Sequence, residues 1–473
     1  MSESFARRIY LLDPRLLNPE AIAVAFAKTS RSPLSFDEIA AELNDEQSAQ
    51  FNEKWVVGYG HASVAEHAIL HIAIENVSRL AVETIEGNRL ASFTEKSTRY
   101  QNWEKHAFHI PLELREHPLE QDYLDTCSKL FDLYMDCQPQ IQVQLARENP
   151  QQPGESTNAY ERRMHSRALD AARYLLPAAS LANLGMTANA RTLEHAISKM
   201  LSSRLEEVRQ IGSSIKETAC ACIPTLIKYA TANEYQRSLP NRIPPESTRS
   251  QNKPESVDWL KLVNYNSFGI EKILAAMLHR HGEQEYELCY EHVLNLKDKE
   301  KRTLLKGILD GLGPHDNLPH EFEHTAYTFD IIMDQGAYYE VKRHRMMTQS
   351  PQELSAALGY ATPRIFKDSD LLERYQSAMT AAAACWFKLA EWNPSVASYI
   401  VPNGFNRRVL LSMNIREADT FIKLRSSPNA HFSVRRVACR MAEEVQKAHP
   451  IIGEFLLQNT AESSESIDQS YFL

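Results

Sequence analysis

Apolar residues with helical spacing occur near the start of the chain and again after its midpoint. Ile22, Ala25 and Phe26 lie on one face of a predicted helix, and Asn18-Pro19-Glu20 supplies the cap, first-turn proline and first-turn acid that begin it. A second stretch with this spacing, Ile270, Ile273, Leu274 and Met277, follows Asn266-Ser267, which is expected to start the helix. An amphipathic helix is therefore predicted at the beginning of each half of the chain.

A different pattern follows each predicted helix. Residues 68–77 and 325–334 alternate apolar and polar positions and contain many branched and aromatic side chains, which predicts strands rather than helices. Each run begins beside a Glu-His pair, Glu66-His67 in the first half and Glu323-His324 in the second. A helical stretch then leads to Gly87-Asn88-Arg89 in the first half and to Arg343-His344-Arg345 in the second.

Both halves also close in the same way. The segment from Arg173 to Pro177 precedes Asn189 in the first half, and the segment from Ser398 to Pro402 precedes Asn414 in the second. Helices are expected after both asparagines. In the first half one long amphipathic helix is expected to carry Leu193, Ala196, Ile197, Met200, Leu201, Leu205 and Val208 on one stripe. This parallel order of elements indicates an internal duplication.

The predicted fold class is therefore α+β and helix-rich, with two tandem copies that each contain a small sheet flanked by long helices. We expect the first repeat at residues 1–232, with a helical insertion at about 103–165, and the second repeat at residues 257–459. Residues 233–256 contain four prolines among polar residues, which is typical of a linker. Residues 460–473 are expected to form a polar, frayed tail, although its aromatic end can dock elsewhere.

Composition narrows the classes of function. The net charge of −9 argues against nucleic-acid or membrane-surface binding, whereas a small anionic ligand needs only a local cluster of arginines. The seven cysteines show no CxxC spacing, so no metal site is expected and a reducing compartment is favoured. No signal peptide or uninterrupted apolar run of about 18 residues is visible, which predicts a cytoplasmic protein without a membrane anchor.

The first half contains a polar segment suited to a nucleotide. Glu95, Ser97 and Arg99 stand at alternate positions, so their side chains would project on one face if the segment is extended. Such a face can bind a phosphate through the arginine and a polar ring through the acid and the hydroxyl. The alternative is a solvated surface strand with an incidental ion pair.

The second half contains a run of cationic groups. Lys342-Arg343-His344-Arg345 repel one another unless an anion or acidic side chains lie opposite, so a phosphate or pyrophosphate site is one interpretation. A basic turn that faces solvent is the other. No glycine-rich dinucleotide loop is present, and the histidines near Glu66 lack the HExxH spacing of a metal site.

Together these segments resemble the signature of the flavin-dependent (alternative) thymidylate synthase family. That signature is RHR-x-x-S-x-N-E-x-S-x-R-Y, after a strand that starts near H-x-S/T-x-x-E-H. The first half matches it at Arg89, Ser92, Glu95, Ser97, Arg99 and Tyr100, and departs from it at Gly87, Asn88 and Thr94. The second half matches it at Arg343, His344 and Arg345, and little afterwards.

A later family motif, N-A-R-x-L…L-R…A-Q-x-E-x-R, is matched at Asn414, Arg416, Leu424, Arg425, Ala430 and Arg435. In the first half the position of Arg425 is taken by Lys199 or Met200, depending on a one-residue gap. The arginine of RxxLP is Arg173 in the first half and is replaced by Ser398 in the second. The losses are complementary, so the two halves can share one site to which each supplies what the other lacks.

The resemblance implies an enzyme that converts dUMP to dTMP by reductive methylation, using FAD, NADPH and methylenetetrahydrofolate. By resemblance, the substrate-binding residues are Glu95, Ser97, Arg99, Arg173, Arg343 and Arg425. Among them Arg425 has the catalytic role, because contact with the uracil edge would favour ionisation of the ring nitrogen. The residues that would line the flavin are Ser30, Ser63, Arg343, His344, Arg345, Asn414 and Arg416.

The family's tetramers draw the residues of each active site from several subunits. A homodimer of this chain would supply four repeats and is therefore the expected assembly, with one FAD per chain. Two alternatives stay open: a non-catalytic descendant that binds a nucleotide or flavin, and a flavoenzyme that modifies another pyrimidine nucleotide.

Overall fold

The chain forms two compact units in the computed structural model, which describes residues 8, 10, 12–29, 32–43, 45–58, 62–243, 258–313, 315–367, 369–456 and 462–473. Unit 1 comprises Met1–Lys96, Pro111–Arg115 and Leu181–Gln251. Unit 2 comprises Ser97–Ile110, Glu116–Ser180 and Asn252–Leu473. Unit 2 therefore combines the second half of the chain with a long segment of the first half.

Unit 1 is a small sheet with helices. Its elements are α1 (Pro19–Lys28), α2 (Phe36–Ala41), α3 (Asp45–Asn52), η1 (Glu53–Gly58), η2 (Ala62–His67), β1 (Ile69–Ser78), α4 (Arg79–Glu86), β2 (Ala91–Glu95), η3 (Leu112–Leu114), β3 (Leu181–Asn189), α7 (Ala190–Leu201), α8 (Glu206–Cys220), α9 (Glu234–Ser238) and η5 (Leu239–Arg242). The antiparallel strand order is β1-β3-β2. The short helices α9 and η5 fall within the segment predicted as a linker, and residues 244–257 lie outside the described residues.

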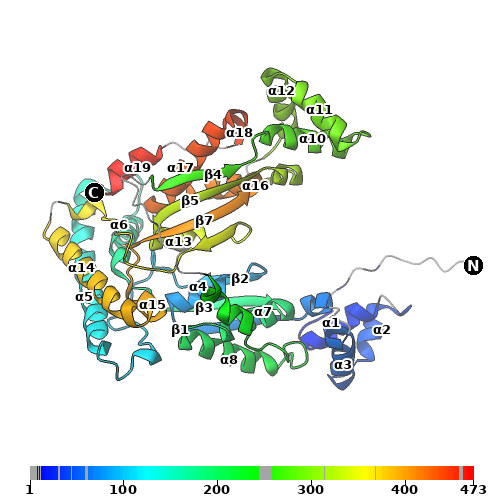
Figure 1. The fold of residues 1–473 in the computed structure, drawn as a ribbon, viewed down its shortest axis with the longest axis horizontal. Helices are drawn as coiled ribbons and strands as arrows, with labels where there is room; N and C mark the ends of the chain where they lie inside the picture. The colour runs from blue at the N-terminus through cyan, green and yellow to red at the C-terminus, as the bar shows by residue number, and fades with distance from the viewer. Residues whose placement is uncertain are drawn as a thin grey trace, which may run out of the picture. The chain divides into compact units, whose positions relative to one another are not determined.

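Unit 2 contains a larger sheet and more helices. Its elements are α5 (Glu120–Glu148), α6 (Thr157–Ala172), η4 (Arg173–Leu175), β4 (Leu260–Tyr265), α10 (Gly269–His281), α11 (Tyr286–Asn295), α12 (Asp298–Leu309), η7 (His320–His324), β5 (Ala326–Asp334), α13 (Gln335–Val341), β6 (Thr348–Pro351), η8 (Arg364–Phe366), α14 (Leu371–Trp392), α15 (Pro394–Ala397), η9 (Ser398–Ile400), β7 (Asn406–Asn414), α16 (Ile415–Arg425), α17 (Phe432–Ala448), α18 (Pro450–Leu456) and α19 (Ser464–Tyr471). The strand order is β4-β5-β7-β6, and the strands are antiparallel (Figure 1).

The two sheets share one register, which confirms the predicted duplication. Ile69 pairs with Asn189 where β1 meets β3, and Ala326 pairs with Asn414 where β5 meets β7. The third strands also correspond, because Ser92 pairs with Thr187 and Thr348 pairs with Ser412. The predicted strands at 68–77 and 325–334 are thus confirmed, and the fold is two copies of one helix-rich α+β plan.

Equivalent asparagines cap the helices that follow the central strands. Asn189 Oδ1 accepts a hydrogen bond from Thr192 N at 2.9 Å, and Asn414 Oδ1 accepts one from Glu417 N at 2.9 Å. Because both helices start at the same cap, Arg425 corresponds to Met200, which is buried, and not to Lys199.

Two predicted helix bounds were wrong. The long helix expected after Asn189 is broken into α7 and α8 at Ser202, whose hydroxyl donates to Ser198 O at 2.6 Å and so competes with the helix ladder. Asn266-Ser267 does not cap α10, which begins after Phe268. Asn266 Oδ1 instead accepts from Ala326 N at 2.8 Å, at the start of β5.

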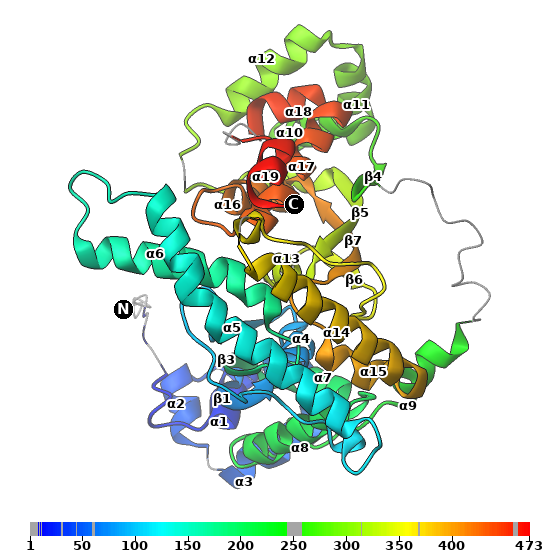
Figure 2. The same ribbon diagram turned by 90° about the vertical axis from the view of Figure 1, so that its left-hand side faces the viewer.

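The repeats meet inside unit 2 through their corresponding proline segments. Pro177 and Pro402 form an antiparallel bridge, Ala178 N donates to Val401 O at 3.0 Å, and Asn403 N donates to Leu176 O at 3.0 Å. The long helices α5 and α14 also pack against each other, as both views show (Figures 1 and 2). Equivalent backbone from both repeats is therefore joined by hydrogen bonds.

A continuous apolar core stabilises the sheet of unit 2. Phe329 and Ile331 of β5 and Leu411 of β7 pack with residues of α10, α16 and α17, including Ile273 and Val437, and all are buried. Burial of this kind is the main favourable contribution to folding. No helix in the described part of the chain is long and apolar enough to cross a membrane.

The C-terminal tail is helical rather than frayed, which corrects the prediction. The ring of Tyr471 stacks on that of Phe432 at 4.9 Å between centroids, and Phe472 O accepts from Arg364 Nη1 at 3.2 Å. Ser464 is held at the other end of α19, because both its N–H and its hydroxyl donate to Glu443 at 2.8 Å. The polar sequence orders because its aromatic end packs on α17, as the alternative allowed.

Candidate functional site

The site begins in the turn that follows β2. We expected Glu95, Ser97 and Arg99 to lie on one extended face, but the strand ends at Glu95 and a turn follows it. Ser97 closes the turn, since its hydroxyl accepts from Arg99 N at 3.2 Å and its carbonyl accepts from Gln101 N at 3.1 Å. The segment is therefore not extended as the alternating arrangement requires, because a serine hydroxyl can replace a strand partner for a nearby N–H.

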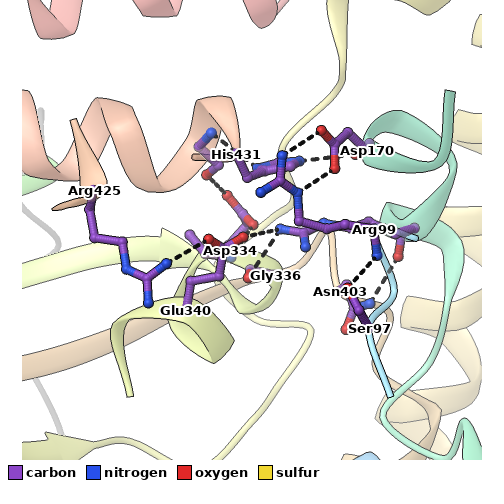
Figure 3. A network of polar contacts seen from close by, with 12 residues as sticks. Ser97, Arg99, Asp170, Asp334, Gly336, Glu340, Asn403, Arg425 and His431 are labelled. Carbon is purple, nitrogen blue, oxygen red and sulfur yellow. Dashed lines mark hydrogen bonds and ion pairs between the residues drawn. The ribbon is translucent and has the colours of Figure 1, made fainter. Parts of the chain in front are cut away.

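The Arg99 side chain forms a two-pronged ion pair with Asp170 of α6. Arg99 Nε donates to Asp170 Oδ1 at 2.8 Å and Nη2 donates to Oδ2 at 3.0 Å, while Nη1 donates to Asn429 O at 3.1 Å (Figure 3). Burial by itself would lower the pKa of Arg99, but the hydrogen bond and charge of Asp170 raise it above the ordinary value. Each of the three nitrogens of this guanidinium thus has an acceptor within unit 2.

The second repeat approaches the same place through α13. Asp334 caps this helix by accepting from Ala337 N at 2.8 Å, and it also accepts a hydrogen bond from the hydroxyl of Ser433 on α17. Burial raises the pKa of Asp334, although Ser433 and the Ala337 amide oppose that shift. Arg173 lies close to the adjacent Gly336, where a Cβ would be 3.0 Å from Asp334 Oδ1 and 3.4 Å from Arg173 Nη2.

Glu340 joins an arginine of each repeat. Its Oε1 lies 3.3 Å from Nη2 of Arg173, and its Oε2 lies 3.3 Å from Nη1 of Arg425 (Figure 3). Arg173 Nη2 also donates to Gly336 O at 3.3 Å. The structure of unit 2 therefore brings together Arg99 and Arg173 of the first repeat with Arg425 of the second.

His344 extends the network on the far side of Arg425. Arg425 Nε donates to His344 Nε2 at 3.0 Å, and a guanidinium is always a donor, so Nε2 must be unprotonated. The other ring nitrogen of His344, Nδ1, is 3.5 Å from Glu417 Oε1. Burial lowers the pKa of Arg425, and Glu340 opposes this while Arg343 and Arg99 add to it.

His431 lies beside Asp170, at the start of α17. Its Nδ1 accepts from Ser433 N at 3.2 Å and caps the helix, and its Nε2 lies 3.0 Å from Asp170 O. Burial lowers the pKa of His431 well below its ordinary value, and the charges of Arg173 and Arg99 lower it further. His431 is therefore a neutral structural support for Asp170.

A family model that matches the chain in two regions shows the family to which it belongs. The model of the family described as thymidylate synthase complementing protein matches residues 12–225 and again residues 261–451. The chain belongs to this family. The two matched regions are the two tandem copies seen in the sheets.

Relatives of this family fall into two groups. The chain is 31% identical to a "UPF0159 protein" of Chlamydia muridarum over 89% of this chain and 83% of that protein. It is 28% identical to a "UPF0159 protein" of Thermoplasma acidophilum over 86% of this chain and 88% of that protein. A flavin-dependent thymidylate synthase of Clostridium tetani is 27% identical over 45% of this chain and 82% of its own length.

Part of the chain is also similar to solved structures. The crystal structure of flavin-dependent thymidylate synthase ThyX of Helicobacter pylori, complexed with FAD and dUMP, covers 42% of this chain and 100% of its own, with a TM-score of 0.32 and 20% identity. A second structure of this enzyme with FAD and dUMP covers 42% of this chain with a TM-score of 0.31.

The remaining residues of the family motifs in unit 2 have other surroundings. Arg343 is exposed and Arg345 is half-buried at the end of α13, whereas the Oδ1 atom of Asn414 is occupied as a helix cap. Arg416 donates to Glu323 Oε1 at 2.8 Å and to Leu318 O at 2.8 Å. The first copy has the same pair, Arg191 with Glu66, so this contact is part of the shared fold.

The other predicted site residues, Glu95, Ser63 and Ser30, belong to unit 1. Glu95 Oε1 lies 3.0 Å from Nη1 of Arg79, and both side chains are almost completely buried. Ser63 is exposed on η2. Ser30 lies outside the described residues.

Sequence reasoning missed the acidic members of the cluster. Asp170 stands three residues before Arg173, and Glu340 stands three residues before Arg343. An acid one helical turn before an arginine is normally taken as a local surface pair. Here each acid instead contacts an arginine from a distant part of the chain. The spacing indicated that each acid pairs with an arginine, but it did not identify which arginine.

Proposed function

We propose that this member of the family is a FAD-dependent thymidylate synthase-like enzyme that converts dUMP to dTMP with methylenetetrahydrofolate and NADPH. The observation that carries the proposal is the network in unit 2, where Arg173 of one repeat and Arg425 of the other both contact Glu340, and Arg99 pairs with Asp170. Two copies with complementary motif losses thereby contribute to one site.

In the proposed site, Arg99, Arg173 and Arg343 hold the nucleotide, while Glu95 and Ser97 orient it. Arg425 contacts the edge of the uracil ring and favours the ionised form of its ring nitrogen. A partly buried guanidinium interacts more strongly with a developing negative charge than a solvated one does. The hydrogen bond from Arg425 to His344 fixes the direction of the guanidinium.

The cationic turn after α13 suits an FAD pyrophosphate. Arg343 is exposed and Arg345 is half-buried there, so the donors fit an anionic group, and Ser30, Ser63, His344, Asn414 and Arg416 are the further proposed neighbours of the cofactor. FAD, when bound, supplies the hydride chemistry that the side chains lack. The work of the chain is then to bind, orient and exclude water.

We also propose a cytoplasmic homodimer that supplies four repeats. All seven cysteines are free thiols, which supports a reducing compartment.

Formation of dTMP from dUMP in the presence of FAD, NADPH and methylenetetrahydrofolate tests the activity. Arg425→Ala should lower the rate at least about 100-fold, as loss of a group that stabilises developing charge does. Flavin binding without dTMP formation would contradict the proposed substrate.

One observation favours a second candidate. All three nitrogens of Arg99 already have intrachain acceptors, so the nucleotide must compete with Asp170 and Asn429 for this side chain. A descendant that binds flavin or nucleotide without turnover, or an enzyme that modifies another pyrimidine nucleotide, would accommodate this arrangement. The absorbance spectrum tests for flavin, because a protein that stays colourless with added FAD is a nucleotide-binding descendant and not a flavoenzyme.

A further inference from the structure

Glu340 occupies a position where an anionic ligand would be expected. It is 6% exposed, and its two oxygens face the two arginines, Arg173 and Arg425, that the proposed function assigns to the nucleotide. A carboxylate between two guanidiniums has the same relationship to them as a bound phosphate or an ionised ring would have. The chain thus carries its own anion in this place.

The contacts made by Glu340 are weaker than those of the neighbouring acid. Each Glu340 oxygen makes a single contact of 3.3 Å, whereas Asp170 binds Arg99 through two bonds of 2.8 and 3.0 Å. Charge-assisted N–H···O bonds are strongest at about 2.7–2.9 Å and when two are formed in parallel. A phosphate that offers three oxygens would therefore displace Glu340 more readily than Asp170.

Arg173 retains an unused donor. It is 3% exposed, and its Nε has no hydrogen-bond partner among the described residues. Buried guanidinium nitrogens nearly always have an acceptor, so an unsatisfied one marks a position for a ligand oxygen. Gly336 lies beside this nitrogen, since a Cβ there would be 3.7 Å from it.

We propose that Glu340 is a specificity-determining residue: an internal anion that a substrate phosphate must displace from Arg173, and that weakens the binding of phosphorylated pyrimidines relative to unphosphorylated ones. The inference rests on the proposed function for the identity of the ligand as a pyrimidine nucleotide. The part that concerns the anion depends only on Glu340 and its two arginines.

The test uses inorganic phosphate as the first probe and the full-length chain. Glu340→Gln keeps the size of the side chain but removes its charge, which leaves the buried Arg173 and the partly buried Arg425 without this counter-ion. The variant should unfold at a lower temperature than the wild type, and phosphate should restore much of the loss, because a ligand that binds only the folded state stabilises it. Phosphate should bind the variant at least about tenfold more tightly than the wild type.

A matched variant controls for general charge effects. Glu271→Gln removes a similarly buried carboxylate of unit 2, 9% exposed, which belongs to α10 and pairs with Lys301 of α12 at 2.6 Å. It should lose stability without any gain in phosphate affinity. Glu340→Ala, tested in the same way, provides a second variant should the glutamine retain the contacts of the acid.

The inference is overturned if neither Glu340 variant binds phosphate more tightly than the wild type, or if phosphate stabilises Glu271→Gln equally. Either result would mean that Glu340 is only a structural partner of the arginines. A second titration compares dUMP with deoxyuridine: Glu340→Gln should strengthen dUMP at least about tenfold and change deoxyuridine less than about threefold. If phosphate behaves as expected but neither pyrimidine binds any form of the protein, the proposed function fails and the anion position stands.

Discussion

Asp334 accepts a hydrogen bond from the hydroxyl of Ser433, and this contact joins the first turn of α13 to the first turn of α17. The corresponding residues of unit 1 are Ser78 and Glu207, which form the same contact with the acid and the hydroxyl exchanged. In both units the residue at the cap also accepts from the third amide of the short helix, Ala81 N or Ala337 N. The two copies thus keep the same hydrogen bond, but the helix that supplies the hydroxyl in one copy supplies the carboxylate in the other.

This exchange predicts rescue in a double variant. Asp334→Ser alone leaves two hydroxyls and should lower stability by about 1–3 kcal/mol, the usual effect of losing a buried charge-assisted hydrogen bond. Ser433→Glu alone places a second carboxylate against Asp334 and should be at least as harmful. The double variant recreates the pair of unit 1 and should recover at least half of the summed loss in urea unfolding. Additive losses would show that the surrounding residues, and not the pair, determine which arrangement is stable.

The shared site predicts that arginines of both repeats are needed for nucleotide binding. Arg99→Ala and Arg343→Ala should each weaken dUMP binding more than about tenfold, because a charge-assisted contact contributes about 1.5–3 kcal/mol. Titration calorimetry on folded protein measures this.

Two controls accompany that experiment. Ser355→Ala alters the position of the second repeat that corresponds to Arg99 and should change binding little. Asp170→Asn weakens the hold on Arg99 without removing it and should keep or improve binding. If only one of the two arginines matters, the site is not composite.

The buried histidine His431 predicts a loss of stability in mild acid. Because burial lowers its pKa in the folded state below the ordinary 6.5, only the unfolded chain takes up this proton as the pH falls below that value. The stability is fully present above about pH 6.5 and declines below it by up to about 1.4 kcal/mol per pH unit.

Urea unfolding at about pH 7 and pH 5 measures this effect. His431→Asn keeps a capping side chain and removes the titration, so its midpoint should fall less than that of the wild type between these conditions. Part of the dependence should remain, because burial also lowers the pKa of His449. Equal slopes for the variant and the wild type would show that His431 is protonated in the folded state or does not titrate in this range.

Cofactor stoichiometry follows from the unequal copies. The positions that correspond to Arg99, Arg173, Arg343 and Arg425 in the other repeat are Ser355, Ser398, Gly87 and Met200. Anionic groups of a nucleotide or cofactor buried beside these residues would lose four of their counter-ions, which is unfavourable by several kcal/mol. We predict one FAD per chain and two per homodimer, measured from flavin absorbance and light-scattering mass. Two flavins per chain would show that the second set of residues also makes a functional site.

Local signals in the sequence were sufficient for most elements. Asn18 caps α1 as predicted, with Oδ1 accepting from Ala21 N at 2.7 Å, and the alternating runs became β1 and β5. These features depend on residues within one or two helical turns or on one face of a strand. The duplication also followed from order and spacing alone, since equivalent segments keep equivalent registers.

The centre of the site was not accessible in this way. Glu340 and Arg173 are separated by 167 positions, and Arg99 and Asp170 by 71, so only the packed fold determines which acid faces which arginine. The turn at Ser97 was missed for a related reason, because the choice between strand and turn depended on where the sheet ends. Alternation alone does not show how far a strand continues.

The bridge between Pro177 and Pro402 has an evolutionary consequence. In an association of identical subunits, every substitution at a twofold interface appears on both sides at once, so neither side can change alone. Here the two sides are encoded at separate positions of one chain, and a change in either is not copied to the other. One side can keep Arg173 where the other has Ser398, and selection can act on each independently. Fusion of the copies has thus made asymmetry heritable.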